Sequence, residues 1–85
     1  MREFNYTIQD ELGIHARPAG LLAKEAGRFQ ATISIQKGDK SADAKRLFAL
    51  MGLGVKKGDT VTVRVEGDDE AAAYEALTQF FKSSL

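Results

Sequence analysis

The only histidine and the only proline of this 85-residue chain lie in one short segment, Gly13-Ile14-His15-Ala16-Arg17-Pro18-Ala19. The residues that follow have helical spacing, so the segment marks the start of a predicted helix. A helix start exposes unpaired backbone N–H groups and a partial positive charge, which together attract anions. A lone histidine at such a position can act simply as a helix cap, or its ring can take part in chemistry.

The chemical role follows from the charges around the ring. We expect the positive helix end and Arg17 to favour a neutral imidazole, whose free lone pair makes it a nucleophile. The oxygens of a phosphoryl group on His15 would be bound by the Arg17 guanidinium and by the backbone of the first turn, around Ala16, Arg17 and Pro18. Pro18 fixes the backbone angle there and costs the helix no hydrogen bond. The segment therefore predicts a phosphohistidine site.

No other catalytic apparatus is recognisable in the sequence. The chain has no cysteine, which excludes a disulfide framework, a thiolate metal site and a cysteine nucleophile. It also lacks a glycine-rich nucleotide loop, paired carboxylates with metal-binding spacing, and a set of Ser, His and Asp that would meet in the fold. Phosphoryl transfer depends mainly on positioning and electrostatic stabilisation. We therefore expect no cofactor and no metal, with one partner protein supplying the phosphoryl group and another receiving it.

Composition and charge limit the remaining classes of protein. With 44% hydrophobic and 28% charged residues, the chain is predicted to form a single domain over residues 1–85. No run of about 18 apolar residues is present, so we expect a cytoplasmic protein without membrane insertion. A net charge of zero argues against binding to nucleic acid. The charge is uneven, however, because residues 12–57 hold nine basic and three acidic side chains, which favours an anionic partner.

Hydrophobic periodicity and turn signals predict seven elements in the order βαββαβα. Strands are expected at residues 2–9, 31–36, 41–43 and 60–66, and helices from residue 16 to about 27, at 46–52, and after a turn at 67–70. The turn is expected to supply an N-cap aspartate for the last helix, whose core face includes Ala73, Leu77 and Phe80 or Phe81. The pattern predicts an α+β, open-faced two-layer sandwich. Its four-stranded antiparallel sheet would be covered on one face by three helices and solvated on the other.

Three segments give the chain a resemblance to a known family: Gly13 to Ala19, Lys45-Arg46-Leu47-Phe48-Ala49-Leu50-Met51-Gly52-Leu53-Gly54-Val55, and Gly67-Asp68-Asp69-Glu70. The chain resembles, over its whole length, the histidine-containing phosphocarrier proteins (HPr) of the bacterial sugar phosphotransferase system. The resemblance implies that His15 is phosphorylated on Nδ1 by enzyme I, which takes the group from phosphoenolpyruvate. A IIA domain of a sugar permease would then receive it, with Arg17 as the assisting cation. The protein would be a monomeric covalent carrier rather than a turnover enzyme.

The resemblance also implies a partner-docking surface beside His15. It would consist of Gly20, Leu21 and Lys24 on the first helix and Arg46, Leu47, Phe48 and Met51 on the second. Leu50 and Leu53 would then point inward, while Leu47 and Phe48 would form an exposed apolar patch. The basic side chains at positions 24, 45 and 46 are either ordinary solvated charges or groups that steer acidic partners toward the patch.

The sequence departs from the family at three positions. Most relatives have a serine at position 46, which a dedicated kinase phosphorylates in many of them; Arg46 has no hydroxyl, so we expect no regulatory serine. Leu12 stands where relatives often have a small polar residue, which removes a hydrogen-bonding group beside the helix start. Gly20 lies within a helix, at a cost of about 1 kcal/mol relative to Ala. The alternative function is that of a regulatory paralogue, nitrogen-related or protein-binding, that does not feed a sugar permease.

Overall fold

The structure, a computed structural model, describes residues 1–85 as four strands and three helices. The strands are β1 (Arg2–Thr7), β2 (Thr32–Lys37), β3 (Lys40–Asp43) and β4 (Thr60–Glu66), and the helices are α1 (Ala16–Ala26), α2 (Leu47–Gly52) and α3 (Glu70–Ser84). The predicted order βαββαβα is confirmed, and no boundary that the sequence predicted is wrong by more than two residues. None of the helices has both the length and the apolar character needed to cross a bilayer.

The four strands form one antiparallel sheet in the order β1-β4-β2-β3. β4 is hydrogen-bonded to β1 on one side and to β2 on the other, with Val63 opposite both Phe4 and Ile35. Alternate residues of β4 are fully buried, as expected for a strand whose apolar side chains recur every two residues. The strand nearest the end of the chain therefore lies in the middle of the sheet.

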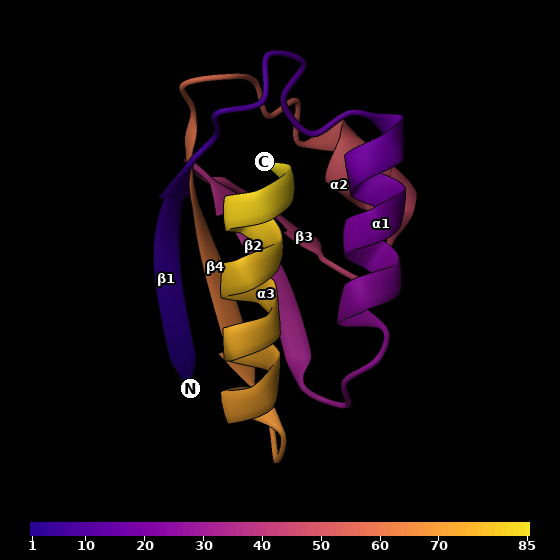
Figure 1. The fold of residues 1–85 in the computed structure, drawn as a ribbon, viewed down its shortest axis with the longest axis vertical. Helices are drawn as coiled ribbons and strands as arrows, with labels where there is room; N and C mark the ends of the chain where they lie inside the picture. The colour runs from indigo at the N-terminus through magenta and orange to yellow at the C-terminus, as the bar shows by residue number, and fades with distance from the viewer.

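One face of this sheet is covered by the helices, with α3 lying along the sheet and α1 beside it (Figure 1). Phe81 of α3 is completely buried and makes edge-to-face contacts with Phe4 and Tyr6 of β1. These ring contacts fix α3 over the edge strand. The buried positions of α1 are small or aliphatic: Pro18, Ala19, Leu22 and Ala26.

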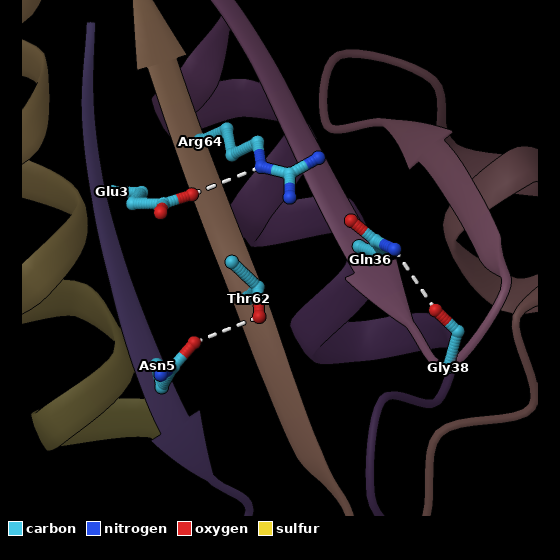
Figure 2. Close-up of polar contacts among 6 residues, drawn as sticks. All are labelled: Glu3, Asn5, Gln36, Gly38, Thr62 and Arg64. Atoms are coloured by element: carbon cyan, nitrogen blue, oxygen red, sulfur yellow. Dashed lines mark hydrogen bonds and ion pairs between the residues drawn. The ribbon is translucent and has the colours of Figure 1, made fainter.

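The opposite face of the sheet is open and polar, as predicted. Arg64 donates to the Glu3 carboxylate at 3.0 Å, and the Thr62 hydroxyl donates to the Asn5 side chain at 2.7 Å (Figure 2). Both contacts join β1 to β4 across the sheet, so this face is stabilised by cross-strand polar pairs rather than by a second layer. The expectation of a one-sided, open-faced sandwich is thus confirmed.

The aspartate predicted at the N-cap of α3 is confirmed in position, but its side chain does not cap the helix. Asp69 occupies the N-cap position, but its side chain makes no hydrogen bond to the helix. Its carboxylate instead accepts the backbone N–H of Gln30 at 2.8 Å and that of Ala31 at 2.9 Å. Both of these N–H groups belong to the segment between α1 and β2, so Asp69 links that segment to the start of α3. The Glu70 carboxylate accepts the Gly67 N–H at 3.2 Å, which supports the turn before the helix.

These contacts predict acid-sensitive stability. The hydrogen bond from Gln30, helped by that from Ala31, holds the pKa of Asp69 below its ordinary value. Because the folded protein favours the ionised carboxylate, this stabilisation is complete above the ordinary Asp value of about 3.9 and is lost as the pH falls through the lower folded value. In urea unfolding at several pH values, Asp69→Asn should be less stable than the wild type at pH 7, and the difference should shrink below about pH 4.

The neighbouring exposed aspartate provides the control for that experiment. The side chain of Asp68 makes no hydrogen bond or ion pair in the structure. Asp68→Asn therefore removes the same charge but leaves the hydrogen bonds from Gln30 and Ala31 to Asp69 in place. Its stability should follow that of the wild type across the pH range. A loss in Asp69→Asn that did not depend on pH would contradict the proposed role of the ionised carboxylate.

Candidate functional site

The loop between β1 and α1 lies directly on the loop that precedes β4. Gly13 has a φ of +68°, and a Cβ at this position would overlap the Val55 carbonyl oxygen and come within 2.7 Å of the Lys56 Cα. Ile14 is buried and donates its N–H to the same Val55 oxygen at 3.1 Å. Glycine is therefore required at position 13 both by its backbone conformation and by the lack of space.

The loop that precedes β4, on which the Gly13 loop packs, is itself held to the sheet by Asp59. Its carboxylate accepts the Lys56 N–H at 2.9 Å and lies 3.2 Å from the Lys37 ammonium, which also donates to the Gly54 carbonyl oxygen at 2.9 Å. The hydrogen bond from Lys56, followed by that from Lys37, keeps the pKa of Asp59 below its usual value. The loop that carries His15 thus rests on a segment anchored to β2 through Lys37.

His15 occupies the N-cap position of α1 but does not cap it with its side chain. Its backbone is extended, with φ −105° and ψ −174°, and its ring makes no hydrogen bond to the first turn. The ring is about one-third exposed, at 36%. A purely structural capping role, one of the two interpretations that the sequence left open, is therefore not what the geometry shows.

A shallow pocket of about 280 Å³ lies in front of the ring. It is lined by Asp10, His15, Arg17, Pro18, Leu21 and Ser84. The predicted pair of His15 and Arg17 is thus brought together at one site. The Arg17 guanidinium takes part in no hydrogen bond or ion pair within the protein, although all four other arginines do. It is therefore free to bind an anion that enters the pocket.

Two of the pocket residues were not predicted from the sequence. Asp10 precedes His15 by five positions, and its Oδ1 lies 3.8 Å from the His15 Nε2. Ser84 reaches the pocket from the last turn of α3. No motif marks either residue; the only signal for Asp10 is an acidic side chain directly after a predicted strand. No group of three or more His, Asp or Glu side chains is arranged to hold a metal ion.

The residues of the expected docking surface are exposed to different degrees. Phe48 is 82% exposed, Leu21 47% and Met51 39%, while Leu50 and Leu53 are buried, as expected. Leu47 differs from the expectation, because it is half-buried and packs against the core. Leu47 precedes the buried Leu50 by three residues and therefore lies on the same face of α2. The exposed apolar patch on α2 therefore consists mainly of Phe48 and Met51.

The small and charged members of that surface differ in their contacts within the protein. Gly20 on α1 has open space where a side chain would be, so its cost as a helical glycine is not explained by close packing within the protein. Lys24 is exposed, and Arg46 is 3.9 Å from the Asp43 carboxylate. The Lys45 ammonium donates to the Phe29 carbonyl oxygen at 2.8 Å, which gives it a structural role. Among the basic residues of that surface, Lys24 alone makes no side-chain hydrogen bond or ion pair, as is also true of Arg17 in the pocket.

Comparison with known proteins identifies relatives over nearly the whole chain. A family model described as the PTS HPr component phosphorylation site matches residues 2–83. A phosphocarrier protein HPr from Lysinibacillus sphaericus is 43% identical over 91% of this chain and 88% of its own length. An HPr-like protein Crh from Halalkalibacterium halodurans is 40% identical over 96% of this chain and 98% of its own.

Solved structures agree with these matches. A histidine-containing phosphocarrier protein from a mycoplasma superimposes with a TM-score of 0.94 at 34% identity, covering 98% of this chain and 94% of the other.

The close approach at Gly13 predicts a large and local effect of substitution. Gly13→Ala should lower the free energy of unfolding by the cost of a left-handed alanine, about 1–2 kcal/mol, and by a further 1–3 kcal/mol or so for overpacking against Val55. Gly54→Ala is the matched control, because Gly54 has a φ of +64° but open space at the Cβ position. Urea unfolding of both variants measures the difference, and equal destabilisation would show that the loops do not press on each other.

Proposed function

Because the chain belongs to the HPr family of phosphocarrier proteins, we propose that His15 accepts a phosphoryl group from enzyme I and passes it to IIA domains of sugar permeases. The observation that carries the proposal is the pocket in which a partly exposed imidazole and an unpaired guanidinium lie together at a helix start. The cytoplasm, where both kinds of partner would be reached, is the proposed location.

The chemistry on this chain needs few groups. The lone pair on Nδ1 attacks the phosphorus atom of the donor, and the bond between phosphorus and the donor breaks with its electrons going to the donor. The phosphoryl oxygens are then bound by Arg17 and by the N–H groups of Ala16 and Arg17, which as the first residues of α1 have no partner within the helix. The helix dipole stabilises the same negative charge. Transfer to an acceptor reverses these steps.

Docking would use the apolar surface next to the pocket. Leu21 lines the pocket and is also part of the exposed surface on α1, which packs against α2. Phe48 and Met51 on α2 provide further apolar area, and Gly20, Lys24 and Arg46 are the other members of the proposed surface. A partner that covers this surface would place its own reactive group over His15. Leu47 would contribute at its exposed edge only.

The regulatory alternative has one observation in its favour, the similarity to an HPr-like protein Crh at 40% identity. A regulatory protein would bind its partners through the same surface without passing phosphate to a permease. The presence of His15 with a free Arg17 disfavours a form that has lost transfer. The two functions differ in whether the phosphorylated chain passes its phosphoryl group to a IIA domain.

A reconstituted transfer assay tests the proposal. The protein is mixed with enzyme I, Mg²⁺ and phosphoenolpyruvate, and ³¹P NMR should show a phosphate that is acid-labile and stable in alkali, as a phosphohistidine is. The signal should be absent in His15→Ala. Arg17→Ala should lower kcat/KM for phosphorylation by about 10- to 100-fold, the loss expected for one charge-assisted hydrogen bond. A signal that persists in His15→Ala would refute the carrier function, and failure to phosphorylate any IIA domain would favour the regulatory one.

The docking surface makes a separate prediction for the same assay. Phe48→Ala should raise the KM for the protein as substrate of enzyme I by about tenfold, because exposed aromatic side chains often dominate binding energy at interfaces. Its stability should change by less than about 0.5 kcal/mol, since Phe48 is 82% exposed. Gln79→Ala, at an exposed position on α3, is the control and should leave KM unchanged. An unchanged KM in Phe48→Ala would place the interface elsewhere.

A further inference from the structure

Asp10 brings a negative charge to one nitrogen of the His15 ring. Its Oδ1 lies 3.8 Å from Nε2, and the two side chains are 32% and 36% exposed. The distance is too long for a hydrogen bond but is within the range of an electrostatic contact. The neighbouring Glu11 is exposed and makes no such contact. Asp10 is therefore the acidic residue that contacts the ring, and the contact is made at Nε2.

Asp10 is held in this position by three hydrogen bonds. Its carboxylate accepts the Leu12 N–H at 2.8 Å, its carbonyl oxygen accepts the Gly13 N–H at 3.0 Å, and its own N–H donates to the Leu85 carbonyl oxygen at 2.8 Å. The residue is thus tied both to the loop that ends at His15 and to the end of α3. Its carboxylate is positioned by the fold rather than by contact with the ring.

We propose that Asp10 is a positioning residue for His15, holding the ring proton on Nε2 so that the lone pair lies on Nδ1. The contact also stabilises the ring after Nδ1 has taken a phosphoryl group. The second part rests on the proposed function, the phosphorylation of His15. The first part concerns the unphosphorylated ring alone.

The stabilisation follows from the movement of electrons and protons. Before transfer, the neutral ring carries its proton on Nε2. When Nδ1 forms the bond to phosphorus, Nε2 keeps that proton, so the ring gains a formal positive charge while the phosphoryl group is negative. The negative Asp10 carboxylate then lies beside the protonated nitrogen, as a carboxylate does beside the imidazolium of a catalytic triad. When the phosphoryl group leaves, the bonding electrons return to Nδ1 and no proton has been gained or lost.

The two charged groups at the ring therefore have separate tasks. Arg17 lines the pocket and is available for the phosphoryl oxygens, whereas Asp10 is next to the ring nitrogen that remains protonated. Ser84, the other polar side chain of the pocket, carries no charge. Arg17 thus stabilises the negative phosphoryl group, and Asp10 stabilises the positive ring.

NMR of the unphosphorylated, ¹⁵N-labelled protein tests the first part directly. Long-range ¹H–¹⁵N correlation distinguishes a protonated from an unprotonated ring nitrogen, and at high pH the wild type should carry its proton on Nε2. Asp10→Asn keeps an oxygen for the Leu12 N–H but removes the charge, and should lower the ratio of the Nε2–H to the Nδ1–H form about two- to fivefold. Glu11→Gln, which removes a neighbouring charge, should leave the ratio unchanged.

Outcomes of this experiment are separable from those of the transfer assay. A wild-type ring with its proton on Nδ1 overturns the proposal without any variant, and so does an unchanged ratio in a folded Asp10→Asn. Phosphorylated Asp10→Asn, which lacks the stabilising charge, should also lose phosphate to a IIA domain faster by a similar factor. Failure of the wild type to become phosphorylated would refute the proposed function, while the ratio measured on the unphosphorylated ring would still decide the role of Asp10.

Discussion

Backbone packs directly on backbone where the loop that carries His15 meets the loop before β4. At Gly13 there is no side chain between the two segments, and the adjacent N–H of Ile14 bonds to the same Val55 oxygen that a Cβ would strike. Their separation is therefore set by covalent geometry and one hydrogen bond. Since Asp59 ties the second loop to Lys37 in β2, the start of α1 is positioned by the sheet itself.

α1 carries its core residues and the residues of the proposed docking surface on different sides. Ala19, Leu22 and Ala26 are fully buried, whereas Leu21 and Lys24 are exposed on the opposite side. Helical periodicity separates them because neighbours in sequence point in different directions. Changes in the exposed residues therefore leave the core intact. On α2 the separation is less complete, because Leu47 belongs to the proposed docking surface and also packs against the core.

The parts of the fold that were predictable depend on contacts between near neighbours. The strands were predicted from the alternation of polar and apolar residues along each segment. His15 and Arg17 were predicted from one short motif. Two of the errors and omissions involve distant partners. Asp69 bonds to backbone groups 39 and 38 positions away instead of capping its helix with its side chain, which no local pattern reveals. Ser84 reaches the pocket from the far end of the chain, so only the folded structure reveals it, whereas Asp10 lies five positions before His15 in a loop that no motif marks.

The central place of β4 has a consequence for synthesis of the protein. Until residue 66 has left the ribosome, β1 has no neighbour in the sheet, and only the β2–β3 hairpin can form. An isolated hairpin is marginally stable in water. The loop that supports Gly13 also precedes β4 and takes its place only when that strand pairs. A nascent chain therefore cannot present an assembled pocket, which is complete only when the sheet has closed and α3 has brought Ser84 to it.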